Sequence, residues 1–304
     1  MEKILFVMNP VSGGIDKDET ILRIHWLSVR EKFDFKFRYT TGENDDETLQ
    51  AEIDWYRPDR VVACGGDGTV LLVARNLINT DIPIGILPLG SANGLATELT
   101  IPEILPEALE LAVKGQVSRP IDLLRFNEKY LGIHLGDIGV NALIVKNYAQ
   151  SGDRRMVGYA RHLFRAFQES EQMQYTIKTP GETYRKEGYM LAFANARRFG
   201  TGVYLSLNGS MSDGRFEICN FQEIQLEELI NLGLTKFELF LDEEMYSDVI
   251  SCKEAEIEIN REVDFQIDGE YIGKVEHLTI STIESAVRII VPGGEDEEEE
   301  TGIA

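Results

Sequence analysis

The 304-residue sequence has few basic residues for its size. Lys and Arg number 30 against 52 Asp and Glu, which gives a formal net charge of −22 at pH 7. The run Glu295–Glu300 supplies only six of these acids, so the rest of the chain is also strongly acidic. Such a chain repels phosphate polyanions at long range, which argues against non-specific nucleic-acid binding. It equally argues against a polybasic anchor on anionic lipid. We expect no nucleic-acid partner.

Cysteine, histidine and long apolar runs are also scarce. Three cysteines far apart in the sequence form neither a disulfide framework nor a zinc ladder, and the four histidines lie on separate segments. No stretch reaches the roughly 18 to 20 apolar residues that span a bilayer, and the start MEKILFVMNP does not resemble a signal peptide. The sequence therefore predicts a soluble, cytoplasmic protein. The oligomeric state stays open, a homodimer included.

The pattern of apolar residues changes near residue 120. Before it, short apolar runs at Lys3–Met8, Phe33–Tyr39, Arg60–Cys64 and Ile82–Leu87 alternate with segments of helical spacing, which predicts βαβ units and a doubly wound parallel sheet. After it, short alternating strands dominate, which is typical of an antiparallel β domain. We expect an α/β domain over 1–120, a β-sandwich domain over 121–292 and an acidic, disordered tail over 293–304.

The most informative segment is the turn Gly65-Gly66-Asp67-Gly68-Thr69 at the end of the third strand. Glycines let the backbone approach a ligand closely, and the helix that follows adds partial positive charge, so a phosphate fits this place. Asp67 suits phosphate through Mg²⁺ or bound water. The alternative is a tight strand-to-helix turn in which Asp67 caps a helix.

Two further glycine turns follow neighbouring strands. Asn9-Pro10-Val11-Ser12-Gly13-Gly14 ends the first strand, and Pro88-Leu89-Gly90-Ser91-Ala92-Asn93-Gly94 ends the fourth. In a doubly wound sheet the carboxyl ends of the strands form the ligand crevice. Thr41, after the second strand, adds a hydroxyl at the same edge. We therefore expect the three turns to lie together, with Ser12, Gly13, Gly65 and Asn93 among the ligand-binding residues.

These turns, together with NARRFGTGV, MSDGRFEI and the late Ile267-Asp268-Gly269-Glu270, resemble the diacylglycerol kinase catalytic-domain family over about residues 3 to 292. The resemblance implies an N-terminal nucleotide domain, a C-terminal β-sandwich that receives a lipid, and ATP in the cleft between them. It implies an ATP- and Mg²⁺-dependent kinase that phosphorylates a hydroxyl of diacylglycerol or a sphingoid-type lipid. Its substrate would come from a membrane, so we expect transient contact with the membrane surface.

The resemblance also implies a role for particular residues. Glu270 corresponds to the proposed general base, Asp67 would organise the phosphates and Mg²⁺, and Asp268 would orient the site. Contacts to ATP are implied for Asn9, Thr41, Gly66, Asp67, Gly68, Thr69 and Ser91. A structural Mg²⁺ is implied at Asp213, with main-chain oxygens of Ser210 and Arg215. Asp213-Gly214 and Asp268-Gly269 are equally typical of plain β-turns.

Two positions depart from the family's pattern. Leu71-Leu72 replaces the usual Asn-Glu after the glycine turn, and Asn141 stands where relatives often have aspartate. Apolar residues after the turn resemble NAD kinases, so an NAD kinase is one alternative. A nucleotide-binding regulator without catalytic activity is the other.

Overall fold

The structure is a computed structural model that describes residues 1–14, 17–151, 171–196, 198–199, 203–204, 209–222 and 249–293. The predicted tail over 293–304 lies outside these residues except for Gly293, as does part of the NARRFGTGV segment. Contacts divide the chain into unit 1, Met1–Ile121 with Ala286–Ala304, and unit 2, Asp122–Ser285. The chain thus returns to unit 1 at Ala286, whereas the domains expected from the sequence, 1–120 and 121–292, are consecutive segments.

Unit 1 alternates strands and helices along the chain. Its elements are β1 (Lys3–Met8), the 3₁₀ turn η1 (Ser12–Gly14), α1 (Lys17–Glu31), β2 (Asp34–Tyr39), α2 (Asp45–Tyr56), β3 (Arg60–Gly65), α3 (Asp67–Asn76), β4 (Ile84–Pro88), α4 (Gly94–Glu98) and α5 (Leu105–Lys114). The strands pair in parallel in the order β2-β1-β3-β4, and Ile289 of the returning segment pairs with Ile84. The predicted parallel α/β fold is confirmed.

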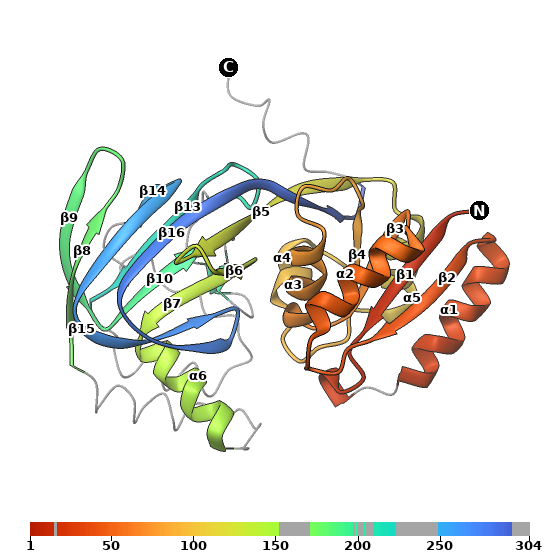
Figure 1. Ribbon diagram of the computed structural model, residues 1–304, viewed down its shortest axis with the longest axis horizontal. Coiled ribbons are helices and arrows are strands. Elements are labelled where there is room, and N and C mark those ends of the chain that lie inside the picture. Colours follow the sequence, from red (N-terminus) through yellow and green to blue (C-terminus); the bar gives the residue numbers. More distant parts are fainter. Residues whose placement is uncertain are drawn as a thin grey trace. The chain divides into compact units, whose positions relative to one another are not determined.

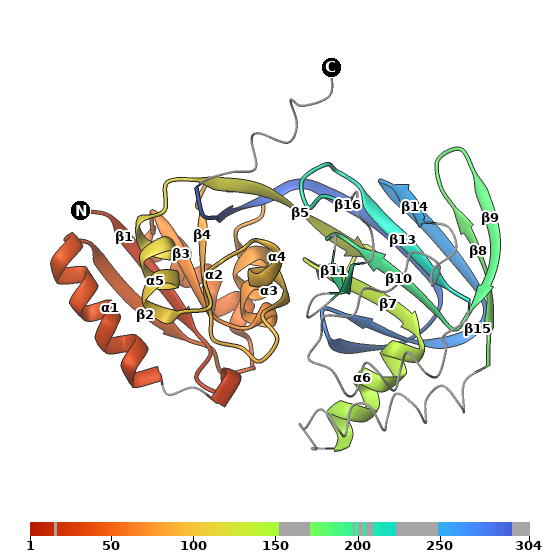
Figure 2. The same ribbon diagram turned by 180° about the vertical axis from the view of Figure 1, so that it is seen from behind.

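Helices cover both faces of this sheet because its central strands are apolar on both sides. Ile4, Phe6 and Met8 of β1 pack with α1 and α5 in one core cluster, and the alternate residue Leu5 is equally buried. Helix α3 contacts β3 and α2 (Figures 1 and 2). The buried sheet holds the carboxyl ends of β1, β3 and β4 in fixed positions beside one another.

Unit 2 is mostly antiparallel. Its elements are β5 (Ser118–Phe126, shared with unit 1), β6 (Tyr130–Gly132), β7 (Leu135–Gly139), α6 (Val140–Ser151), β8 (Met173–Lys178), β9 (Thr183–Gly188), β10 (Met190–Ala194), β11 (Arg198–Phe199), β12 (Val203–Tyr204), β13 (Phe216–Phe221), β14 (Val249–Cys252), β15 (Glu254–Ile267) and β16 (Glu270–Ile290, also shared with unit 1). The central order is β14-β13-β10-β7-β15. The predicted antiparallel β domain is confirmed.

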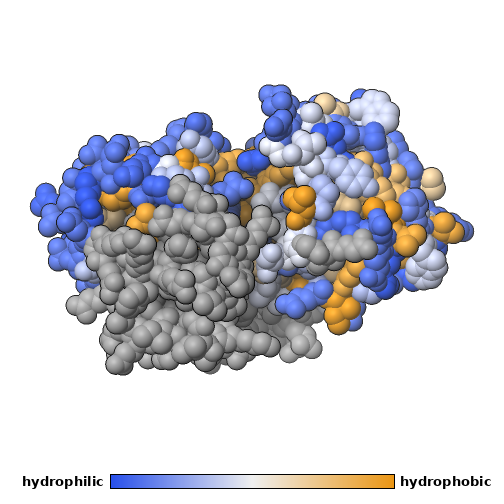
Figure 3. Space-filling model, turned by 90° about the horizontal axis from the view of Figure 1, so that it is seen from below, coloured by the Kyte–Doolittle hydropathy of each residue, from blue (hydrophilic) through white to orange (hydrophobic). Residues whose placement is uncertain are grey.

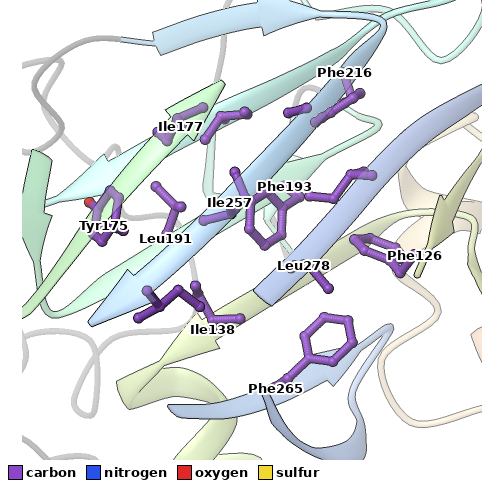
Figure 4. Close-up of a cluster of buried hydrophobic side chains, with 14 of the residues drawn as sticks. Phe126, Ile138, Tyr175, Ile177, Leu191, Phe193, Phe216, Ile257, Phe265 and Leu278 are labelled. Carbon is purple, nitrogen blue, oxygen red and sulfur yellow. The ribbon is translucent and has the colours of Figure 1, made fainter. Parts of the chain in front are cut away.

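The core of unit 2 is a cluster of aromatic and branched aliphatic side chains from several strands (Figure 4). Phe126 is one of its members, with ring centroids 6.1 Å from Phe193 and 5.5 Å from Phe265. Strands β15 and β16 are long, and their register shifts between Phe265 and Gln266. This core and the shift fix the place where the two strands join at residues 267–270.

Hydrophilic residues dominate one face of the described part of the protein (Figure 3). On the face that Figure 3 shows, hydrophilic residues make up most of the described atoms and hydrophobic ones are scattered. Larger exposed apolar side chains occur on α1 and α2, among them Leu22, Trp26, Val29 and Trp55. Among the described helices, none has the length and apolar character needed to cross a bilayer.

Candidate functional site

The turns after β1, β3 and β4 lie against one another in unit 1. The Asn9 N–H donates to the Cys64 carbonyl at 3.0 Å, and the Leu89 N–H donates to the Gly65 carbonyl at 3.0 Å. These bonds continue the parallel pairing of the strands past their ends. The structure therefore brings together the three glycine turns that the sequence places at one sheet edge.

Glycine is required at two contacts between these turns. Gly13 has φ +59°, and a Cβ there would collide with the Leu89 carbonyl. A Cβ at Gly90 would collide with the Cα of Gly66. Main chain thus packs directly on main chain, and the lining of this site is formed largely by backbone groups.

Asp67 connects two of the turns. Its Oδ2 accepts the Gly94 N–H and its Oδ1 accepts the Leu95 N–H, each at 3.0 Å. Asp67 is the first residue of α3, yet the N–H groups that it accepts begin α4. The helix-cap alternative is thus realised on a second helix. Each carboxylate oxygen keeps further acceptor capacity, so this arrangement is compatible with a role toward water or Mg²⁺.

Asn93 shapes the turn after β4. Its Oδ1 accepts the Gly90 N–H at 2.8 Å, and its Nδ2 donates to the carbonyls of Pro88 (3.2 Å) and Gly90 (3.0 Å). With φ +52° it occupies the left-handed region that Asn tolerates. Ser91 is exposed in this turn, so its hydroxyl is accessible to a ligand.

The polar residues after β1 and β2 are partly engaged in their own turns. Asn9 Oδ1 accepts the Val11 N–H at 3.1 Å, and Ser12 Oγ donates to the Asn9 carbonyl at 3.0 Å. Thr41 is exposed, and its hydroxyl donates to the Glu43 carbonyl at 3.0 Å. Thr41 follows β2, the strand beside β1, so it lies at the predicted sheet edge.

The two residues that follow Asp67 at the start of α3 differ in their exposure to solvent. Gly68 is exposed, whereas Thr69 is buried and its Oγ1 lies directly against Gly65. The first N–H groups of α3 have no acceptor within the helix itself, and the helix dipole adds partial positive charge. The backbone at Asp67 and Gly68 is therefore the part of this turn best suited to an anion.

Glu270 lies in unit 2, as the first residue of β16. Ile267 and Glu270 pair across a two-residue turn whose Asp268 and Gly269 have φ +47° and +81°. Both positive values are typical of the tight hairpin turn that Asp-Gly favours. The plain β-turn interpretation of this pair therefore holds, and the same turn presents the exposed Glu270 at the strand's beginning.

Asp268 anchors this turn to the segment before β7. Its carboxylate accepts the N–H groups of Ile133 (2.8 Å), His134 (3.0 Å) and Leu135 (2.8 Å). Burial raises the pKa of the Asp268 carboxyl, and the three N–H groups act in the opposite direction by favouring the anion. Asp268 is thus an anchor of the turn that carries Glu270.

The Asp213 turn is held by a buried acid that the sequence analysis does not single out. Asp122 is 1% exposed, and it accepts the N–H groups of Gly214 (2.7 Å) and Ser285 (2.6 Å). Asp213 is exposed, and its Oδ1 accepts the Arg215 N–H at 2.9 Å. The available signal for Asp122 was a lone carboxylate inside the apolar strand Ile121–Phe126.

Carboxylates gather around this turn, and the pKa is raised for two of them. Burial, with Asp213 nearby, raises the pKa of Glu217 to about 7. Burial also raises the pKa of Asp122, and the charges of Asp213 and Glu284 add to it. Such a concentration of acids suits a cation. In the part of the chain that the structure describes, no three His, Cys, Asp or Glu side chains form a metal cluster, so a metal here would depend on Asp213 and main-chain oxygens.

Comparison with known proteins agrees with this architecture. Residues 3–126 match the family described as diacylglycerol kinase catalytic domain, and residues 136–291 match the YegS C-terminal NAD kinase beta sandwich-like domain. The second match covers just over half of the chain, so the chain belongs to the family with a YegS C-terminal NAD kinase beta sandwich-like domain, which here follows a diacylglycerol kinase catalytic domain. The catalytic-domain match makes the protein an enzyme of the kinase type.

Curated relatives in this family align along most of their length. A protein of Yersinia enterocolitica named "Probable lipid kinase YegS-like" is 28% identical over 265 residues, covering 84% of this chain and 86% of the relative. "Probable lipid kinase YegS" of Shigella dysenteriae is 27% identical, covering 93% and 95%. The crystal structure of a diacylglycerol kinase from Bacillus anthracis has a TM-score of 0.74 at 20% identity, covering 96% and 97%, which supports the fold.

The departures from the kinase family's pattern have a structural explanation in one case. Leu71 and Leu72 are both 7% exposed and lie in the core of unit 1. Their apolar character therefore contributes to packing of α3. The polar contacts that the family's Asn-Glu pair would make are therefore absent at these two positions.

One residue beside the candidate site is not singled out by the sequence analysis. Lys17, the first residue of α1, donates from Nζ to the Ser12 carbonyl at 2.9 Å, and it is 9% exposed. Burial lowers the pKa of its ammonium group, with Cys64 acting in the opposite direction. A lysine three residues after the end of the NPVSGG turn was the available signal. It places a positive charge beside turns whose other groups are mainly backbone.

Proposed function

We propose that this protein is an ATP- and Mg²⁺-dependent lipid kinase that phosphorylates a hydroxyl of diacylglycerol or a related sphingoid-type lipid. The observation that carries the proposal is the packing of three glycine turns at one edge of the unit 1 sheet, joined by Asp67. The names of the curated relatives support a lipid as the acceptor. A membrane-derived substrate requires transient contact with a membrane surface.

In this proposal the turns of unit 1 bind the phosphates of ATP. Backbone N–H groups at Asp67 and Gly68 donate to phosphate oxygens, with Asn9, Thr41 and Ser91 providing side-chain contacts. The Lys17 ammonium adds a positive charge beside the first turn. Mg²⁺, when bound, neutralises phosphate charge, and Asp67 is the residue placed to hold it or its water ligands. Positioning and charge neutralisation are the main requirements of phosphoryl transfer.

Glu270 provides the general base in this proposal. It is exposed, so a substrate hydroxyl has access to it, and Asp268 fixes the turn from which it projects. The lipid oxygen forms a bond to the γ-phosphorus while the bond from that phosphorus to the bridging oxygen of ADP breaks. The hydroxyl proton passes to Glu270. Asp213, with main-chain oxygens of Ser210 and Arg215, would hold a structural Mg²⁺ that offsets the charge of the surrounding acids.

The test uses the full-length protein, γ-labelled ATP, Mg²⁺ and a mixed lipid extract, with product identification by mass spectrometry. We expect label in a phosphorylated single-hydroxyl lipid and loss of product when EDTA removes the metal. A parallel reaction contains NAD in place of lipid. Formation of NADP would favour an NAD kinase, and tight ATP binding without any phosphorylated product would favour a regulator.

A further inference from the structure

A chain of buried polar groups runs from the centre of unit 2 to the turn that carries Glu270. Asp137 on β7 is 0% exposed, and Gln266 on β15 is 1% exposed. The two residues pair across neighbouring antiparallel strands, and the Gln266 side-chain NH₂ donates to Asp137 Oδ2. Asn141 donates to the same oxygen at 2.6 Å. Asp137 thus accepts two side-chain amide donors, one from β15 and one from α6.

The other end of the Gln266 amide reaches the turn. Gln266 Oε1 accepts the Gly269 N–H at 2.8 Å, and Gly269 directly precedes Glu270. A glutamine amide has its donor and acceptor on opposite sides, so rotating it by half a turn would exchange them. The rotated amide would set its NH₂ against the Gly269 N–H and its oxygen against the Asp137 carboxylate. Asp137, an acceptor when ionised, therefore selects the orientation that holds Gly269.

The backbone conformation of the turn does not by itself require this chain. Asp-Gly adopts the two positive φ values readily, and Asp268 already anchors the turn to residues 133–135. The amide of Gln266 adds a constraint on a different atom, the N–H of the residue adjoining Glu270. A carboxylate buried without a charged partner is costly to the fold. Among the described residues its side-chain partners are Asn141 of α6 and Gln266, and the amide of Gln266 leads to the turn, which points to a function in the site.

We propose that Asp137 is a positioning residue for Glu270, acting through the side-chain amide of Gln266 and the Gly269 N–H. The proposal rests on the proposed function, in which Glu270 accepts the proton of the substrate hydroxyl. Asp137 touches neither substrate nor nucleotide in this account. Its contribution is to keep the peptide that leads into Glu270 in one orientation.

The first test measures the link itself, independent of catalysis. Amide hydrogen exchange at Gly269 is followed by NMR of the full-length ¹⁵N-labelled chain for wild type, Gln266→Met and Asp137→Asn. We expect the Gly269 amide to exchange faster in Gln266→Met, which lacks the acceptor, and by a smaller factor in Asp137→Asn. Tyr175→Phe is the matched control, because it removes a buried hydrogen bond to Asn220 elsewhere in unit 2. Exchange at Gly269 that stays at the wild-type rate in both test variants overturns the proposal.

The second test separates positioning from a general loss of stability. Lipid phosphorylation with γ-labelled ATP is measured for the two variants and for the double variant. We expect kcat to fall about tenfold in Gln266→Met with the KM for ATP unchanged, as for a displaced general base. Asp137→Asn is expected to have a smaller effect and to add nothing in the Gln266→Met background, because it acts through that amide. Independent, multiplying effects on kcat would contradict the proposal.

The two proposals fail in different ways. If the wild-type protein phosphorylates no lipid, the proposed function falls, and the exchange rates at Gly269 still decide whether Asp137 holds this turn. If the wild type is active and Tyr175→Phe lowers kcat as much as Gln266→Met does, the loss reflects stability and the positioning role is wrong.

Discussion

In unit 1 the candidate site is built from main chain, whereas in unit 2 it is built from buried polar side chains. The turns of unit 1 meet where glycines allow backbone to touch backbone, as at Gly90 and Gly66. The Glu270 turn of unit 2 is held by Asp268 and Gln266. A backbone site suits a ligand such as a triphosphate, which needs several N–H donors. A base needs a single side chain held in one orientation.

The two units also differ in how they respond to pH. Burial raises the pKa of four carboxyl groups in unit 2, namely Asp122, Asp137, Glu217 and Asp268. For Asp137 and Glu217 the pKa reaches about 7. In unit 1 the carboxyl groups with a shifted pKa, Asp45 and Glu110, have it lowered instead, as does Glu256 of unit 2, which bonds His277. Stability changes near neutral pH should therefore arise in unit 2.

The largest expected effect is at the base. Replacement of Glu270 by Gln removes the proton acceptor while keeping the size of an exposed side chain, so the fold should not change. We expect kcat to fall by ~10²- to 10⁴-fold, the usual contribution of a general base. Steady-state kinetics with γ-labelled ATP and lipid measure this. Turnover at the wild-type rate would show that another group accepts the proton.

The second prediction concerns the buried acids of unit 2. The folded pKa of Glu217, about 7, exceeds its ordinary value of 4.5, so the folded protein keeps this proton more readily than the unfolded chain. The stability from this group is complete below the ordinary value and is lost as pH rises through about 7. Glu217→Gln removes that dependence, amounting to at most about 3 kcal/mol. The free energy of unfolding of wild type and Glu217→Gln, measured with denaturant between pH 4.5 and about 7, checks this prediction. If it changes with pH to the same extent in both proteins, Glu217 is not the group responsible.

The third prediction addresses the backbone site of unit 1. Gly90→Ala places a methyl group against the Gly66 Cα and separates two of the turns. We expect a loss of about 1–3 kcal/mol in stability, typical of an added methyl in a tightly packed place. Affinity for Mg·ATP should fall as well. Calorimetric titration measures the affinity for Mg·ATP, and thermal unfolding measures the stability. If neither differs from wild type, close packing of Gly90 on Gly66 is not required for the fold or for nucleotide binding.

The smallest expected effect is at a side chain in the same turn. Ser91 is exposed, and Ser91→Ala removes only its hydroxyl. Stability should stay within about 0.5 kcal/mol, as for most surface changes. Affinity for Mg·ATP should fall less than in Gly90→Ala. A larger loss of affinity in Ser91→Ala would show that side chains, and not main chain, dominate nucleotide binding in unit 1.

The sequence predicted best the features that depend on local pattern. The apolar run before Gly65 and the glycines after it predicted a strand, a turn and a helix, and Asp-Gly before Glu270 predicted a tight turn. Features that depend on distant contacts were not visible. Asp67 accepts N–H groups 27 and 28 residues later. Asp122 binds segments about 90 and 160 residues away.

The interpretation of Leu71 and Leu72 shows the same limit. From the sequence, these residues indicated a loss of polar contacts and a resemblance to NAD kinases. In the structure both are buried, so their apolar side chains have a packing role that no local pattern reveals. Lys17 and Gln266 were missed for the converse reason, because single polar residues gain significance only from the groups beside them.

Calorimetric titration of Mg·ATP into wild type, Asp67→Ala and Glu270→Gln tests the division of labour between the units most directly. Wild type and Glu270→Gln should bind with equal affinity. Asp67→Ala, which releases the N–H groups of Gly94 and Leu95, should bind much more weakly. Equal affinity in all three proteins, or a loss confined to Glu270→Gln, would contradict nucleotide binding by the turns of unit 1.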